Sequence, residues 1–153
     1  MGPSGVIRLL VIETEDAFRS KVSERLRQEN YKVYEACQEI EAGRIIEHKD
    51  IDVALLGLRG LRQRGLSFLK GLKKVHPQVE IILIAPPGEI ALSIEGMKLG
   101  AFDDILTPFD METLLDRINA AYRQKASRES HEGAESAGGG METAGEPPYG
   151  NEK

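Results

Sequence analysis

The sequence contains one cysteine, no tryptophan and three histidines in 153 residues. A single cysteine, Cys37, cannot form a disulfide within the chain and supplies no metal-binding spacing. Because Cys37 follows a strand-like run, we expect a partly buried, inert thiol. The three histidines lie in separate segments and form no ligand pattern. The sequence therefore predicts neither a disulfide framework nor a cysteine–histidine metal site.

Long hydrophobic runs and an excess of positive charge are also missing. No stretch of 18 apolar residues is present, which predicts no transmembrane helix. The first five residues lack the basic start of a secretory signal, so we expect a cytoplasmic protein. The net charge of −5 argues against a nucleic-acid-binding or membrane-surface protein. Serine-nucleophile, dinucleotide and P-loop motifs are absent, so we predict no catalytic residues, no cofactor and no enzyme activity.

The apolar pattern alternates between strand-like and helix-like segments. The predicted strands cover 6–12, 31–36, 52–56, 80–84 and 105–106, and the predicted helices cover 17–29, 38–48, 66–75, 89–99 and 111–125. Strict alternation of this kind is typical of a parallel sheet with helices on both faces. With right-handed crossovers, the sequence predicts a three-layer, flavodoxin-like, doubly wound α/β fold with strand order 2-1-3-4-5.

The composition changes near the end of the last predicted helix. Residues 126–153 contain six glutamates against one arginine and one lysine, together with a Gly-Gly-Gly run. Such a segment has little apolar surface to bury. We therefore expect a flexible N-terminus over residues 1–5, one domain over 6–125 and a disordered acidic tail over 126–153.

The residue directly after the predicted strand at 52–56 is unusual for its position. In open parallel sheets, functional side chains lie at the carboxyl ends of the strands. Residue 57 is such a position, and it is glycine. We interpret the following residues, 59–65, as a loop that carries Arg59, Arg62 and Arg64.

Three short motifs carry a resemblance to a known family. They are Met-Lys-Leu-Gly-Ala at 97–101 after the fourth predicted helix, Pro-Phe-Asp at 108–110 before the fifth, and Gly-Leu at 65–66 where the third begins. In this spacing they resemble the receiver domain of bacterial two-component response regulators. The resemblance covers about residues 6–124 and implies the CheY-like version of the predicted fold.

The resemblance implies a phosphorylation pocket, which these residues keep only in part. Family members form an acyl phosphate on one aspartate, with Mg²⁺ held by that aspartate and an acidic pair, and with a lysine and a Ser/Thr contacting the phosphoryl group. The corresponding positions here are Glu13 and Thr14 for the acidic pair, Gly57 for the acceptor, Ala85 for the Ser/Thr, Thr107 for the lysine and Asp104 for a conserved switch aromatic. Only Glu13 keeps its acidic character, and it is the one weak candidate for a metal ligand.

These departures imply a degenerate receiver, or pseudo-receiver, that acts in two-component signalling as a protein–protein adaptor. The alternatives are a phosphorylatable regulator with an unconventional acceptor and a small-ligand sensor that uses the vacated pocket. One loop arginine is a candidate to reach Glu13 or Glu15 in place of a cation; the alternative is three solvated arginines. The Thr107–Pro108 bond corresponds to a bond that is usually cis in the family.

The fourth predicted helix is unusually apolar for a helix on one face of a sheet. Its candidate interaction residues are Ile90, Leu92, Ile94, Met97 and Lys98. In receivers, this helix, the fifth strand and the fifth helix form the dimer or output face. We therefore expect a protein partner there, namely a histidine kinase, another regulator or a second copy of the chain. The alternative is a helix that is simply buried more deeply.

Overall fold

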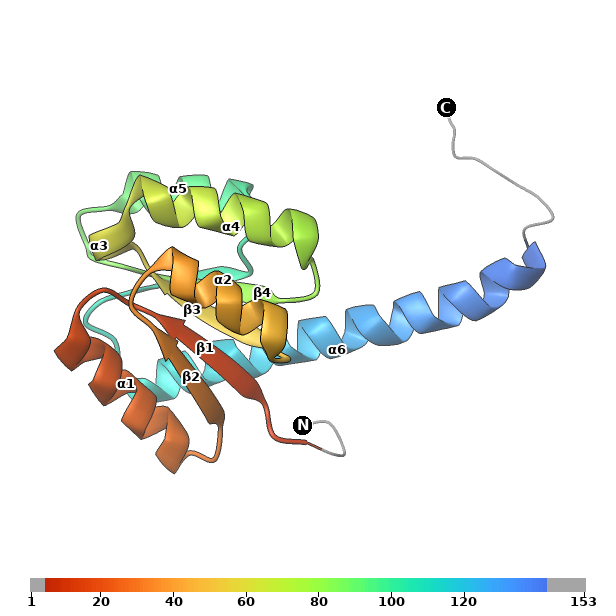
Figure 1. Ribbon diagram of the computed structural model, residues 1–153, viewed down its shortest axis with the longest axis horizontal. Helices are drawn as coiled ribbons and strands as arrows, with labels where there is room; N and C mark the ends of the chain where they lie inside the picture. The colour runs from red at the N-terminus through yellow and green to blue at the C-terminus, as the bar shows by residue number, and fades with distance from the viewer. Residues whose placement is uncertain (1–4, 143–153) are drawn as a thin grey trace.

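The computed structural model describes residues 5–142 and contains one parallel five-stranded sheet with the order β2-β1-β3-β4-β5. The strands are β1 (Arg8–Ile12), β2 (Lys32–Ala36), β3 (Val53–Gly57), β4 (Glu80–Ala85) and β5 (Asp103–Leu106). The predicted fold class and strand order are therefore confirmed (Figure 1).

Six helices follow the strands and cover both faces of the sheet. They are α1 (Asp16–Gln28), α2 (Glu39–His48), α3 (Leu58–Leu61), α4 (Gln63–Val75), α5 (Ile90–Lys98) and α6 (Met111–Glu142). Helices α2 to α5 pack on one face, and α1 and α6 pack on the other, which gives the three layers. No helix among the described residues has the length and apolar character needed to cross a membrane.

The alternation of side chains along β1 explains the two cores. Leu10 and Ile12 belong to the core beneath α2 to α5, and Leu9 and Val11 belong to the core beneath α1 and α6. Strands β3 and β4 are buried along their whole length. Continuous apolar runs are typical of parallel strands that are covered on both faces, which is how the sequence is able to specify the central strands.

Helix α5 is followed, two residues after its last residue Lys98, by a glycine whose backbone conformation favours glycine. Gly100 has a φ of 112°, and the N–H of Ala101 donates to the carbonyl of Gly96 at 3.1 Å. This left-handed residue and the backward hydrogen bond terminate the helix and turn the chain into β5. The turn fixes where β5 begins and therefore where its carboxyl end lies.

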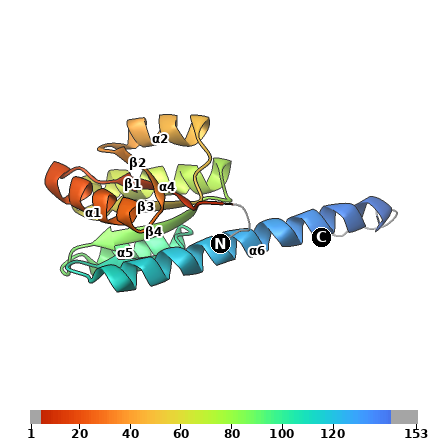
Figure 2. The ribbon, with the colours of Figure 1, turned by 90° about the horizontal axis from the view of Figure 1, so that it is seen from below.

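Three boundaries differ from the sequence-based expectation. Residues 58–61 and 63–75 are helical, so most of the expected 59–65 loop is absent. Strand β5 begins at Asp103, before the expected start at 105. Helix α6 continues to Glu142 and projects beyond the sheet, so the expected helix end near residue 125 is wrong (Figure 2). The first four residues and the end of the expected tail lie outside the described residues.

Candidate functional site

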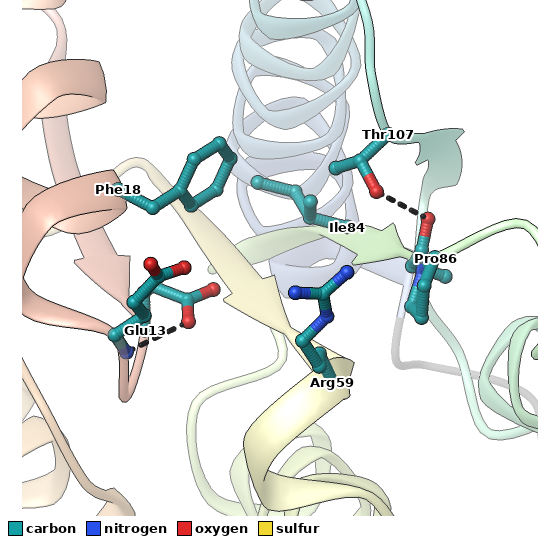
Figure 3. A pocket seen from close by; sticks show the side chains of 8 residues that line it. Glu13, Phe18, Arg59, Ile84, Pro86 and Thr107 are labelled. Carbon is teal, nitrogen blue, oxygen red and sulfur yellow. Dashed lines mark hydrogen bonds between the residues drawn. The ribbon is translucent and has the colours of Figure 1, made fainter.

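The carboxyl ends of four strands meet around one small cavity. Glu13 follows β1, Arg59 lies in α3 directly after β3, Ala85 ends β4 and Thr107 follows β5. The cavity measures about 100 Å³ and is lined by Glu13, Glu15, Phe18, Arg59, Ile84, Ala85, Pro86 and Thr107 (Figure 3). The fold thus brings Glu13, Ala85 and Thr107, three of the residues singled out from the sequence, to one place.

Gly57 and Thr14 lie beside this cavity in close-packed positions. A Cβ atom added to Gly57 would overlap the Glu13 carboxylate oxygen Oε1 and lie 3.1 Å from Glu13 Cδ. A Cβ atom added to Gly60 would overlap the Thr14 hydroxyl oxygen and lie 2.9 Å from Thr14 Cβ. The side chains of residues 13 and 14 therefore occupy the space that side chains at 57 and 60 would need.

Glu13 is a buried carboxyl group with only 6% of its surface exposed. Its Oε2 atom accepts a hydrogen bond from the backbone N–H of Glu15 at 2.9 Å. Burial raises the pKa of Glu13, and the hydrogen bond from Glu15 and the positive charges of Arg59 and Arg19 oppose that rise. Arg19 also donates to the backbone carbonyl of Glu13 at 2.7 Å, which holds the chain where it leaves β1.

Arg59 projects from α3 into the cavity, between Glu13 and Thr107 (Figure 3). Among the described residues no carboxylate oxygen lies within 4.0 Å of its guanidinium nitrogens, although its charge lowers the pKa of Glu13. Arg62 instead pairs with Glu89 at 2.8 Å and Arg64 with Glu39 at 3.3 Å. The hypothesis that one of the loop arginines pairs with the carboxylate of Glu13 or Glu15 is therefore wrong. Arg59 shares their cavity and acts on Glu13 through its electrostatic field.

Thr107 is fixed against the end of β4. Its backbone N–H donates to the carbonyl of Ala85 at 2.9 Å, and its hydroxyl lies 3.5 Å from the same oxygen (Figure 3). The Thr107–Pro108 peptide bond is cis. Asp104 lies on β5 opposite Leu83 and does not line the cavity.

The walls of the cavity include apolar residues that the sequence does not single out. They are Phe18, which lies on the same side as Glu13, and Ile84 and Pro86, which lie on the side of Thr107 (Figure 3). Phe18 stands in the first turn of α1, and its ring meets Phe109 edge-to-face at a centroid distance of 6.2 Å. Phe18 comes shortly after the acidic segment 13–16, and this position in the sequence could have indicated that it lies near the cavity.

The cavity does not fit the magnesium ion that the receiver fold implies. A hard divalent cation needs several oxygen ligands, and Gly57 and Ala85 have no side-chain oxygen. One oxygen of Glu13 already accepts a hydrogen bond, and the Arg59 guanidinium points into the same space. Within the described residues, no group of three His, Cys, Asp or Glu side chains is arranged to hold a metal ion.

The candidate interaction residues of α5 do not all face outward. Ile90, Ile94 and Met97 are 58%, 52% and 39% exposed, and Lys98 is exposed as well. Leu92 is buried in the core beneath α5, so its inclusion in the interaction face is wrong. Leu106 of β5 is 44% exposed, so apolar side chains reach the surface on α5 and on β5.

Comparisons with known proteins place this geometry in a family. The family described as "Response regulator receiver domain" matches residues 9–119. A putative NtrX-like response regulator from Rickettsia typhi is 28% identical over 115 residues, which cover 74% of this chain and 24% of that protein. The chain thus spans about a quarter of the length of this relative.

Two further matches cover nearly the whole length of the compared proteins. The sporulation initiation phosphotransferase F of Bacillus subtilis is 23% identical over 111 residues, which cover 72% of this chain and 90% of that protein. The crystal structure of a CheY-like receiver domain protein from Methanospirillum hungatei superposes with a TM-score of 0.75 at 21% identity, covering 81% of this chain and 99% of that one. With a family match over most of its length, the chain belongs to the response regulator receiver domain family of two-component signal transduction.

Proposed function

We propose that this receiver domain is a pseudo-receiver, which acts through protein contacts without forming an acyl phosphate at residue 57. In this role it is a cytoplasmic adaptor in a two-component pathway, and it docks to a histidine kinase, to another regulator or to a second copy of itself. It has no catalytic activity of its own and needs no metal ion.

One observation carries the proposal: the Glu13 side chain lies over Gly57. A glycine has no nucleophilic side chain, and the neighbouring carboxylate fills the space in which one would stand. Arg59 adds a fixed positive charge to the cavity, in a region where an active site would need a divalent cation. Ala85 offers no hydroxyl, and Thr107 offers no charge, to a phosphoryl group.

The test is incubation of the full chain with acetyl phosphate or beryllofluoride in the presence of Mg²⁺, followed by intact mass and ¹H–¹⁵N NMR spectra. We expect no mass increase and no shift of the amides of residues 13, 57, 85 and 107. The paired variant Glu13→Asp/Gly57→Asp, which returns a short acid to both positions, is the matched comparison. A stoichiometric acyl phosphate on the unmodified chain would contradict the proposal and favour a regulator with an unconventional acceptor, for which Glu13 is the carboxylate to examine.

The surface of α5, β5 and α6 is the proposed partner face. Ile90, Ile94 and Met97 present apolar side chains on α5, and Leu106 does so on β5. Grouped exposed apolar residues mark interaction sites more often than single ones do. The substitution Ile94→Lys should abolish self-association or kinase capture. Ile40→Lys is the matched control, because Ile40 is 69% exposed on α2, which packs against β1 and β2 at the side of the sheet away from β5.

A second candidate function is that of a small-ligand sensor. The observation that favours it is the cavity of about 100 Å³ with the Arg59 side chain directed into it. Native mass spectrometry of the purified chain tests this idea. An adduct that disappears in Arg59→Gln but persists in Arg64→Gln would support a sensor, and a bare chain in all three cases would favour the adaptor.

A further inference from the structure

A second group of charged side chains lies at the amino-terminal ends of the strands, where β3 and β4 begin, on the side of the sheet away from the cavity. Asp52 stands directly before β3, and Glu80 is the first residue of β4. Both are buried, with 7% and 2% of their surface exposed. They are adjacent, because the N–H of Glu80 donates to the carbonyl of Asp52 at 3.1 Å. Two neighbouring buried carboxylates require positive partners.

Helix α6 supplies a partner for Asp52. The Nζ atom of Lys125 lies 3.1 Å from Asp52 Oδ1 and 2.7 Å from Glu129 Oε2. The other carboxylate oxygen of Asp52 accepts a hydrogen bond from the backbone N–H of Arg8 at 2.8 Å. Asp52 therefore ties α6 to the starts of both β1 and β3.

The same helix also supplies a partner for Glu80. The Nη1 atom of Arg128 lies 2.8 Å from Glu80 Oε2, an ion pair whose angles do not satisfy a hydrogen bond. Lys73 of α4 lies 3.8 Å from Glu80 Oε1 and donates to the carbonyls of Pro77 and Val79, at 2.9 Å in each case. Glu80 therefore joins α6 to α4 and to the start of β4.

The two contacts on α6 belong to one face of the helix. Lys125 and Arg128 are three residues apart, which places their side chains on neighbouring positions one turn apart. Both lie beyond residue 119, where the match to the receiver family ends. The charges also balance, because three cations (Lys73, Lys125 and Arg128) meet three carboxylates (Asp52, Glu80 and Glu129). This balance and the burial of Asp52 and Glu80 indicate a built contact, in contrast to the exposed ion pairs elsewhere on the surface.

We propose that the Asp52–Lys125 and Glu80–Arg128 pairs form a clamp that fixes the direction in which the C-terminal half of α6 leaves the domain. The clamp grips the same two strands, β3 and β4, whose carboxyl ends carry Gly57 and Ala85 at the candidate site. A shift of either strand along its axis would move a clamp residue together with a cavity residue. The clamp thereby connects the sheet to the projecting helix seen in Figure 2.

The first experiment is amide hydrogen exchange on the full chain with the variant Lys125→Met/Arg128→Met. Methionine keeps the helix propensity and the apolar stem and removes the charge. We expect amide exchange of residues 120–130 to accelerate about tenfold more than that of β1, β3 and β4, where the unpaired acids cost some stability. Arg123→Met is the matched control, because Arg123 is exposed on the same helix, and it should leave both regions unchanged.

Two outcomes would overturn the proposal. Unchanged exchange in residues 120–130 would show that the pairs contribute nothing to holding α6. Equal acceleration in α6 and in the sheet would show that the pairs support global stability and not the helix direction.

The second experiment measures the direction of the helix itself. Nitroxide labels at Ser20→Cys on α1 and Ser130→Cys on α6, in a Cys37→Ser background, report one distance by pulsed electron paramagnetic resonance. Both serines are exposed, so the labels do not disturb the core. We expect a single narrow distance distribution that broadens in Lys125→Met/Arg128→Met and is restored in Lys125→Arg/Arg128→Lys. An identical narrow distribution in all variants would contradict the clamp.

Discussion

Glu13 and Gly57 fit together as a pair, because the Glu13 carboxylate lies where the first side-chain atom of any other residue at position 57 would stand. The long acid at 13 and the missing side chain at 57 are two parts of one arrangement. A substitution at one position must therefore be judged with the other.

Gly57→Asp should destabilise the domain by about 1–3 kcal/mol, because the new side chain overlaps Glu13 in a buried site. The double variant Glu13→Asp/Gly57→Asp should recover part of this loss, since the shorter acid vacates the space. Urea denaturation measures both. Gly71→Asp is the control, since nothing lies within 4 Å of a Cβ atom at that position. Strict additivity of the two single changes would contradict the steric coupling.

Glu13→Gln should stabilise the protein above the ordinary pKa of glutamate by about 1 kcal/mol. Burial raises the pKa of Glu13, so the folded state binds the proton more tightly than the unfolded state does. The stability of the unmodified protein therefore decreases as the pH rises from the unfolded pKa through the folded pKa. Glutamine carries no charge below or above the pKa of glutamate, and it keeps a side-chain oxygen that accepts the hydrogen bond from the Glu15 N–H.

Unfolding free energies at pH 4 and pH 8 test this expectation. The difference between the two values should be smaller in Glu13→Gln than in the unmodified protein. Glu24→Gln, on the exposed side of α1, should leave the difference as it is. A larger loss of stability in Glu13→Gln at pH 8 would mean that the charged form is the one the fold favours.

Arg59→Gln should raise the pKa of Glu13 further, because the positive charge of Arg59 lowers it in the unmodified protein. An NMR titration of the Glu13 side-chain carbonyl carbon measures the change directly. Arg64→Gln should have no such effect, since Arg64 pairs with Glu39 instead. A pKa of Glu13 that does not move in Arg59→Gln would remove Arg59 from the electrostatics of the cavity.

Leu92→Ala should cost about 2–4 kcal/mol of stability, because Leu92 is buried beneath α5. Ile94→Ala, on the exposed side of the same helix, should change stability by less than about 0.5 kcal/mol. Thermal or urea unfolding distinguishes the two. Equal effects would mean that α5 is oriented differently from the arrangement described above.

The alternation of apolar runs was sufficient to predict the parallel sheet and its strand order. Strands β3 and β4 are apolar on both faces, and central strands of a sheet covered by helices on both sides bury every such side chain. The motif spacings were sufficient to place Glu13, Ala85 and Thr107 at one edge. The orientation of the side chains was not accessible in the same way. Two of these orientations depend on α3: Glu13 lies over Gly57, and Arg59 rather than Arg62 or Arg64 enters the cavity. Helix α3 has only four residues, between β3 and Arg62 with its positive φ, and so short a helix has no periodic sequence pattern that predicts it.

The end of α6 was mispredicted for a related physical reason. Residues after 125 have almost no apolar periodicity, and a sequence pattern detects helices by the apolar face they bury. Here the helix is held by Lys125 and Arg128 against two acids more than 40 residues away along the chain. Ion pairs over such separations leave no local signature, although Asp52 and Glu80, charged residues at the starts of buried strands, were visible.

The length of α6 beyond Arg128 gives the domain a lever arm. At about 1.5 Å of rise per residue, the helix from Arg128 to Glu142 extends roughly 20 Å past the ion pair of Arg128 with Glu80 of β4. A tilt of about 10° at that contact would displace the far end by roughly 4 Å by simple geometry. A rearrangement too small to change the packing of the sheet would therefore be a large movement for anything attached to the end of this helix.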